Sequence, residues 1–159
     1  MEEMPRHQCV IYDGSPARLL PAIAASITQR LRDNLRCLYL NSPAMVAGVR
    51  SYLFAAGVDP DDEVAKGRLI LTSDQSQITD GYFDASVMIR QLEEAVSQAV
   101  KDGFDGLWAT GDMGWEMGRD CDLKKLVDYE FQLEELFQRH TMLYGLCQYH
   151  HGTLSNEVI

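Results

Sequence analysis

The residues best suited to chemistry lie where an apolar run, Gly106 to Thr110, leads into a polar and aromatic segment that ends at Glu116. Hydroxyl, carboxylate and indole groups follow one another there, in Thr110, Asp112 and Trp115. Such a combination can hold a small molecule by hydrogen bonds and aromatic contact. The sequence shows no nucleophile with its base beside this segment and no phosphate-binding loop, so the segment favours recognition over catalysis.

Five short apolar runs alternate with four helical patterns, and these elements must position that segment. We expect strands at residues 9–12, 37–40, 68–72, 106–110 and 141–147. We expect helices that begin near Ser15, Ser42, Asp84 and Leu123, with loops at 58–66, 74–83 and 114–122. Strict alternation of strands and helices predicts right-handed crossovers and a mostly parallel sheet. The predicted fold class is therefore α/β, a single three-layer domain over residues 1–159.

Composition and charge narrow the class of protein. The 159 residues suit one domain, and a net charge of −10 disfavours direct binding to nucleic-acid phosphates. No apolar run approaches the roughly 18 residues of a membrane span, and the N-terminus lacks the pattern of a signal peptide. The four cysteines form no CxxC pair, which is typical of a reduced cytosolic protein. We therefore expect a cytoplasmic protein with no membrane partner and no direct nucleic-acid partner.

Ligands of open parallel sheets bind beyond the carboxyl ends of the strands. In this sequence those ends carry aromatic, sulfur-containing and polar side chains, a mixture that suits an apolar pocket with polar anchors. The predicted ligand-binding residues are Tyr12, Thr110, Asp112, Met113, Trp115, Glu130, Cys147 and Tyr149. The aromatic members would form the walls, the polar members would form the anchors, and the cysteine would add a polarizable contact. We predict no catalytic residue, no cofactor and no metal.

Glu130 stands out because it lies within the apolar stripe of the last predicted helix, three or four residues from Leu126, Val127 and Leu133. An inward carboxylate needs a partner or a proton. Glu130 could therefore hold the segment 110–116 or the ligand itself. Alternatively, its side chain could lean to the edge of the helix and reach solvent.

Cysteine and histidine occur near both ends of the chain. His7 and Cys9 begin the first strand, whereas Cys147 and His150 end the last one. Parallel pairing of these strands would place His7 and His150 at opposite edges of the sheet, which makes one tetrahedral site from all of these residues awkward. If a metal bound, Cys147 and His150 would be the first ligands to expect. Buried structural cysteines are the default interpretation.

The turn after the first strand does not support a nucleotide site. A phosphate-binding loop would need the pattern G-x-x-x-x-G-K-[ST] at this place. Residues 13–20 contain one glycine and no lysine, and Pro16 removes an amide donor. We therefore reject ATP hydrolysis.

Six short motifs occur in an order that resembles a known family. They are His7-x-Cys9-x-x-Tyr12, Cys37-Leu-Tyr-Leu40, Gly81-Tyr-Phe-Asp84, Thr110-Gly-Asp-Met-x-Trp115, Tyr129-Glu130 and Leu146-Cys-Gln-Tyr149. Together they cover nearly the whole chain and resemble the methanogen/methylotroph sensory domain (MEDS domain) of the dichloromethane-dehalogenase regulator type. The resemblance implies a fold like that of RecA and other P-loop NTPases, with a degenerate nucleotide site.

The resemblance also implies a stand-alone or fused sensory domain for small organic compounds, including hydrocarbon derivatives. Such domains accompany histidine kinases, transcription regulators and anti-sigma-type regulators, so signalling would need a partner of that kind. No catalytic residues carry over from the family. The family pattern usually continues several tens of residues past the Cys147-Gln-Tyr149 strand, which predicts a chain truncated at its C-terminal end. An uncovered sheet edge there would favour a homodimer.

Three functional hypotheses follow. The leading hypothesis is a non-enzymatic regulatory domain that binds a small organic ligand and signals through a partner protein. The alternative is a protein–protein interaction module on a degenerate ATPase fold, with no small-molecule ligand and a closed pocket around Trp115. The third, an enzyme that uses Asp112 and Glu130 as an acid–base pair, has the least support because no nucleophile or cofactor motif accompanies them.

Overall fold

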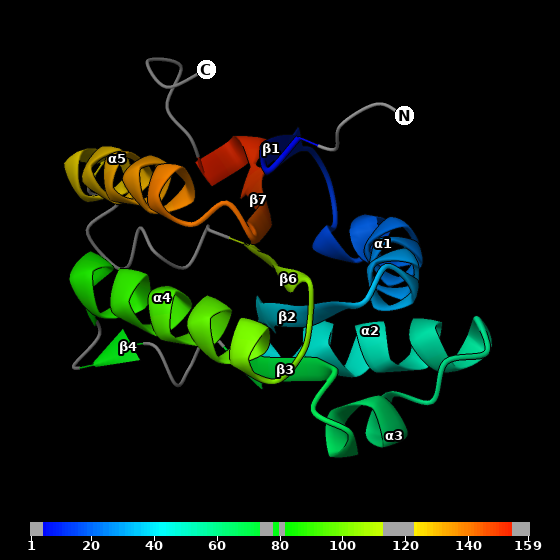
Figure 1. Cartoon of the computed structure of the whole chain (residues 1–159). Helices are drawn as coiled ribbons and strands as arrows, with labels where there is room; N and C mark the ends of the chain where they lie inside the picture. The colour runs from blue at the N-terminus through cyan, green and yellow to red at the C-terminus, as the bar shows by residue number, and fades with distance from the viewer. Residues whose placement is uncertain (1–4, 74–77, 80–81, 113–122, 154–159) are drawn as a thin grey trace.

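Alternating strands and helices fold into a sheet of five parallel strands, in the order β1-β7-β6-β2-β3, with helices on both faces (Figure 1). The computed structural model describes residues 5–73, 78–79, 82–112 and 123–153. The strands of this sheet are β1 His7–Tyr12, β2 Leu35–Asn41, β3 Leu69–Ser73, β6 Gly106–Asp112 and β7 Leu143–His150. The longer helices are α1 Leu20–Arg32, α2 Pro43–Ala55, α4 Ala85–Lys101 and α5 Leu123–Arg139. The predicted three-layer α/β fold is confirmed, and it is consistent with a RecA-like domain.

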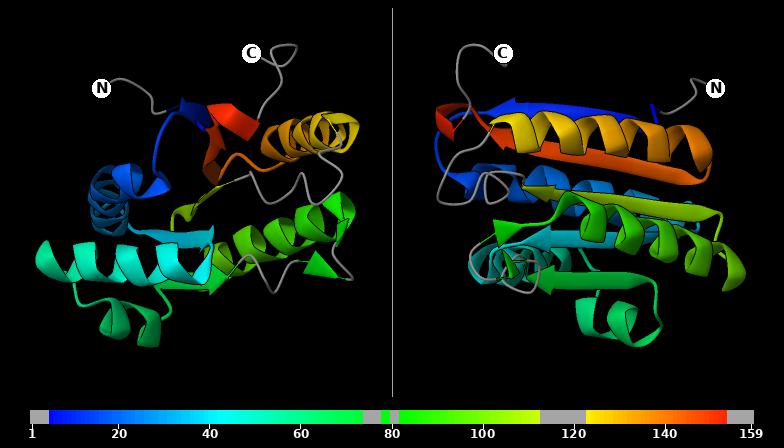
Figure 2. Two further views of the ribbon diagram at one scale, coloured as in Figure 1. Left: turned by 180° about the vertical axis from the view of Figure 1, so that it is seen from behind. Right: turned by 90° about the vertical axis from the view of Figure 1, so that its left-hand side faces the viewer.

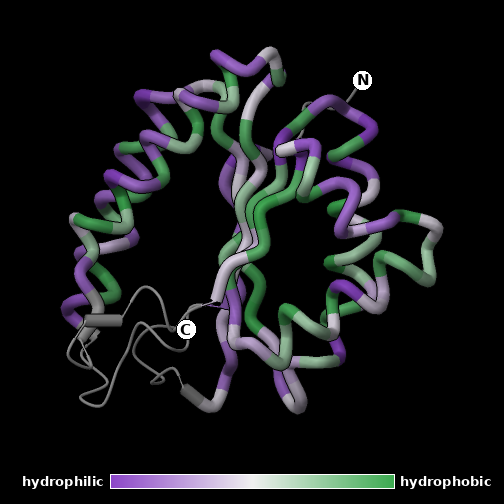
Figure 3. Tube along the Cα trace, turned by 90° about the horizontal axis from the view of Figure 1, so that it is seen from below, coloured by the Kyte–Doolittle hydropathy of each residue, from purple (hydrophilic) through white to green (hydrophobic). Residues whose placement is uncertain are grey.

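The direction of the crossovers decides which helix covers which face of the sheet. From β1 the chain passes through α1 to β2 and through α2 to β3, and it returns through α4 to β6 and through α5 to β7. Right-handed crossovers that run in opposite directions place their helices on opposite faces. Accordingly, α1 and α2 lie on one face, whereas α4 and α5 lie on the other (Figures 2 and 3). This arrangement brings α5 over β7 and alongside the edge strand β1.

Two apolar clusters fill the space between the sheet and its helices, because alternate residues of a strand point to opposite faces. On the α1 and α2 side the fully buried members include Ile27, Tyr39 and Leu53. On the α4 and α5 side they include Leu136 and Leu143. Odd and even positions of a strand therefore face opposite sides of the sheet. This alternation, which we call strand parity, decides which side chains can share a site.

Side-chain caps lie at three of the four predicted helix starts, Ser15, Ser42 and Asp84. Ser42 accepts a hydrogen bond from the amide of Met45 at 3.3 Å, and Asp84 accepts one from the amide of Ser86 at 3.0 Å. At Ser15 the chain first forms the 3-10 turn η1, Pro16–Leu19, and then enters α1. Helix α5 has the bounds that its pattern predicted.

The predicted loop at 58–66 was wrong, and the predicted connection at 74–83 contains two short strands. Residues 58–66 contain helix α3, Pro60–Ala65, because Asp59 caps it and Pro60 suits its first turn. Within 74–83, β4 Ile78–Thr79 pairs antiparallel with β5 Tyr82–Phe83. The predicted loop at 114–122 lies outside the described residues.

The last strand begins and ends later in the chain than the predicted strand at 141–147. Strand β7 continues to His150 and is followed by the 3-10 turn η4, His151–Thr153. Parallel pairing with β1 extends as far as Tyr12 and His150, and the polar residue Gln148 is therefore buried within the sheet. Among the helices that the structure describes, none combines the length and the apolar character needed to cross a membrane.

Candidate functional site

A large cavity lies between helix α5 and the edge strand β1, and we call it the α5–β1 groove. Its volume is about 490 Å³. The strands contribute His7, Cys9, Ile11 and Tyr149 to its lining. Helix α5 contributes Leu126, Val127, Glu130, Phe131 and Glu134. Four of these nine residues are apolar and five carry titratable groups, so the groove combines an apolar wall with polar anchors, as small-molecule sites do.

Strand parity explains why these side chains face the groove. His7, Cys9 and Ile11 are alternate residues of β1, so they point to the same face of the sheet. The pairing of β1 with β7 puts Cys9 directly beside Cys147, and Tyr149 follows on the same face. Because β1 is an edge strand, α5 covers these residues from the side of β7 and leaves their other side open.

The exposed apolar side chains of α5 identify the open side of the groove. Phe131 is 70% exposed and Val127 is 43% exposed, whereas Leu133 in the same helix is buried. The apolar stripe predicted for this helix is therefore not buried at Val127. Its exposure follows from the place of α5 alongside the edge strand β1, past which the described residues form no further strand of the sheet.

The ring of His7 is fixed on two sides. Its Nδ1 atom lies 3.0 Å from a carboxylate oxygen of Glu134, and its ring stacks on Phe137 with centroids 4.6 Å apart. Gly145, the register partner of His7, makes room for that aromatic ring, because a Cβ there would lie 2.8 Å from the Cζ atom of Phe137. Consequently, the Nε2 atom of His7 is left facing the inner wall of the groove.

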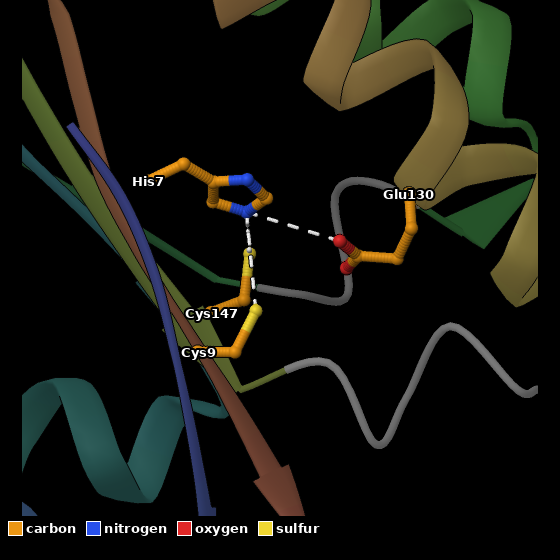
Figure 4. A group of neighbouring side chains, drawn as sticks. All are labelled: His7, Cys9, Glu130 and Cys147. Atoms are coloured by element: carbon orange, nitrogen blue, oxygen red, sulfur yellow. Dashed lines mark hydrogen bonds and ion pairs between the residues drawn. The ribbon is translucent and has the colours of Figure 1, made fainter. Parts of the chain in front are cut away.

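Around that nitrogen atom lies a compact group, His7, Cys9, Glu130 and Cys147, which we call the His7 cluster (Figure 4). The Nε2 atom lies 3.9 Å from the sulfur of Cys9, 3.7 Å from that of Cys147 and 3.8 Å from Oε2 of Glu130. Figure 4 shows the side chains pointing toward one another from two strands and α5. The cluster joins groups that are more than a hundred residues apart in sequence.

Glu130 is held at the boundary between core and groove. Its side chain is 29% exposed, and its Oε1 atom accepts a hydrogen bond from the hydroxyl of Tyr149. The expectation of a partnered inward carboxylate describes this residue better than the alternative of a side chain that reaches solvent at the helix edge. The hydrogen bond and the ion pair that the structure gives Glu130 are with Tyr149 and His7. Neither contact involves residues 110–112, the described part of the segment that Glu130 was expected to hold.

The four groups of the His7 cluster perturb one another's protonation. The pKa of Cys9 is lowered to about 5, chiefly by the hydrogen bond with Cys147 and then by the one with His7. The pKa of His7 is raised to about 9, chiefly by Cys9, with a further contribution from Glu134. Burial raises the pKa of Glu130 to about 7. These opposite shifts favour the charged forms of both groups, a thiolate at Cys9 and an imidazolium at His7.

A second polar network lies on the opposite face of the sheet. Tyr12 donates a hydrogen bond to the carboxylate of Asp112, and burial is the first cause of the raised pKa of Tyr12. Thr110 donates to the carbonyl of Leu146 at 2.6 Å, and Gln148 donates to the hydroxyl of Thr110 at 2.9 Å. These bonds link β1, β6 and β7, and they satisfy polar groups buried in the sheet.

The structure thus divides the predicted ligand-binding residues between two faces. Glu130, Cys147 and Tyr149 gather at the α5–β1 groove, whereas Tyr12, Thr110 and Asp112 belong to the network on the other face. The predicted Met113 and Trp115 lie outside the described residues.

Sequence reasoning left His7 and Cys9 out of the ligand-binding set, predicted no metal, and named Cys147 with His150 as the pair to expect if a metal bound. That pairing was wrong, because His150 points to the other face of β7 and lies beside Tyr12. The expectation that His7 and His150 lie at opposite ends of the paired strands is confirmed. The spacing of His7 and Cys9 could have revealed a shared face, since residues two apart in a strand point the same way.

A comparison with protein families adds one finding to this geometry. The family model described as "MEDS: MEthanogen/methylotroph, DcmR Sensory domain" matches residues 6–159. The match confirms the resemblance indicated by the six sequence motifs. A comparison with curated proteins gives no match.

Proposed function

Because the chain belongs to the methanogen/methylotroph sensory domain (MEDS) family, we propose that it is a sensory domain whose small organic ligand binds in the α5–β1 groove. The observation that carries the proposal is the groove itself. Its volume of about 490 Å³ suits a small organic molecule, since ligand pockets typically measure about 300–1,000 Å³. The sensory role of the family makes recognition, and not catalysis, the function that we propose.

The lining favours a neutral hydrocarbon derivative. Ile11, Leu126, Val127 and Phe131 would bury the apolar part of the ligand. The carboxyl groups of Glu130 and Glu134, together with the net charge of −10, disfavour an anion. A single hydroxyl or carbonyl group on the ligand could exchange hydrogen bonds with Glu130 or Tyr149 at the inner end.

Ligand binding would change the relation between α5 and β1, because the ligand would fill the space between them. A sensor carries a signal only if its ligand binds one of two states more tightly than the other. We propose that the two states differ in the position of α5 over the edge strand. A partner protein, such as a histidine kinase or a transcription or anti-sigma-type regulator, would read that difference.

Nuclear magnetic resonance tests this proposal. We expect a panel of neutral compounds, comprising N-phenyl-1-naphthylamine, short alkanols and chlorinated alkanes, to include members that shift the backbone amide signals of residues 7–11 and 126–131. Amides of α2 serve as the internal control, because this helix lies on the opposite face and exposes Tyr52 and Phe54. If no compound shifts the groove amides, the interaction module without a small-molecule ligand becomes the better account.

A further inference from the structure

We propose that the His7 cluster binds a borderline-soft divalent metal ion such as Zn²⁺, through His7 Nε2, the sulfur atoms of Cys9 and Cys147, and the carboxylate of Glu130. The proposal stands on the geometry of these four side chains and does not depend on an organic ligand in the groove. It also differs from the sequence expectation of no metal, and from the pair Cys147 and His150.

The distances suit a tetrahedral ion. In a tetrahedral zinc site, metal–nitrogen bonds of about 2.0 Å and metal–sulfur bonds of about 2.3 Å place neighbouring ligand atoms roughly 3.4–3.8 Å apart. In the His7 cluster the separations from Nε2 are 3.7, 3.8 and 3.9 Å, and all four ligand atoms lie within 4.8 Å of one another. Side-chain movements of less than an ångström would therefore complete the coordination.

Hydrogen bonding alone accounts poorly for this arrangement. The Nε2 atom of His7 carries at most one proton, yet three partner atoms surround it at nearly equal distances. One proton can serve only one of them well. A cation at the centre would instead accept a lone pair from every member, and it would offset the negative charge of the thiolates and the carboxylate.

The surroundings of His7 resemble the support that metal-bound histidines need. Its Nδ1 atom lies 3.0 Å from the Glu134 carboxylate, an arrangement that leaves the Nε2 lone pair for a metal. The stacked ring of Phe137 fixes the plane of the imidazole. Glu134 is thus a positioning residue and not a ligand.

The types of ligand select the metal. Two thiolates and an imidazole favour zinc-like ions, whereas magnesium and calcium prefer sets made only of oxygen atoms. Coordination needs the neutral imidazole and both thiolates, so binding would release protons to the solvent. Cys147 is buried, whereas Cys9 is exposed at the groove, which gives the ion a route of entry.

Titration with Co²⁺ tests the proposal, because tetrahedral thiolate-bound cobalt absorbs in the near ultraviolet and the visible. We expect the untagged chain, kept reduced with a phosphine, to bind one equivalent of Co²⁺ with both bands and to release it to Zn²⁺. The variant Cys9→Ser should keep the fold, since Cys9 is exposed, and should lose about half of the thiolate band, one of two sulfur ligands having gone. The double variant Cys9→Ser/Cys147→Ser should lose that band altogether.

Matched controls separate the cluster from other residues of the same types. Cys37→Ala should keep the thiolate band, because Cys37 lies in the apolar core on the other face. His7→Gln should weaken Co²⁺ binding at least about tenfold and Glu134→Gln also about tenfold. His140→Gln should leave it unchanged, because His140 contacts Glu93 of α4 and is not a member of the cluster. The proposal would be overturned if the wild-type chain showed neither cobalt band, or if the double variant Cys9→Ser/Cys147→Ser kept the thiolate band. Neither result would affect the binding of organic compounds in the groove, which the amide shifts report separately.

Discussion

Replacement of Val127 by tryptophan is expected to lower the affinity for N-phenyl-1-naphthylamine at least about tenfold, a loss of about 1.4 kcal/mol or more in binding free energy. Val127 lines the α5–β1 groove and is 43% exposed, so an indole there can project into the groove without entering the core. It would occupy the volume that the probe needs. The fluorescence increase of the probe on titration gives the dissociation constant directly.

A matched substitution on the neighbouring helix controls for added surface hydrophobicity. Val100 in α4 is 42% exposed, nearly the same as Val127, but it does not line the groove. Val100→Trp should therefore leave the affinity for the probe within about twofold of that of the wild type, since a solitary surface apolar group forms no pocket. Equal losses in the two variants would show that the probe does not bind in the groove.

The substitution Leu136→Ala should lower the free energy of unfolding by about 3 kcal/mol, within the range of 2–5 kcal/mol for buried leucines. Leu136 is fully buried in the cluster that attaches α5 to the sheet. Its truncation removes apolar contacts and leaves a cavity that the surrounding side chains can only partly fill. Urea denaturation followed by circular dichroism would measure the change.

Phe131→Ala in the same helix is the control for this prediction. Phe131 is 70% exposed and lines the groove, so its removal should change the free energy of unfolding by less than about 0.5 kcal/mol. It should nevertheless weaken binding of the probe, because one apolar wall is lost. If Phe131→Ala lowered the free energy of unfolding as much as Leu136→Ala, Phe131 would pack in the core and would not form an exposed wall of the groove.

Much of the fold could be predicted from the sequence because its signals are local. The caps at Ser42 and Asp84 and the periodicity of residues 123–139 each depend on a few neighbouring residues. Helix α3 escaped prediction although Asp59-Pro60 carries the same kind of signal, since the acidic residues that follow suggested a loop. Exposure along a helix was less predictable, as Val127 shows, because it depends on where the sheet ends.

The site could be predicted only in part because it depends on strand order and register. The carboxyl ends of the strands were treated as one region, but parity places Tyr12 and Asp112 on one face and Tyr149 on the other. The meeting of Cys9 with Cys147 needs β1 and β7 to be neighbours in one particular register. Nothing local in the sequence fixes that pairing, which results from the packing of the whole sheet.

The central claim is that a small organic ligand lies between α5 and β1. Intermolecular nuclear Overhauser effects between N-phenyl-1-naphthylamine and the protein test it most directly, because they report protons within about 5 Å of the probe, a distance close to that of apolar side chains in contact. We predict effects from the methyl groups of Ile11 and Val127 and from the ring of Phe131, all of which line the groove. Effects from Tyr52 and Phe54 of α2 instead would place the probe on the opposite face and contradict the account.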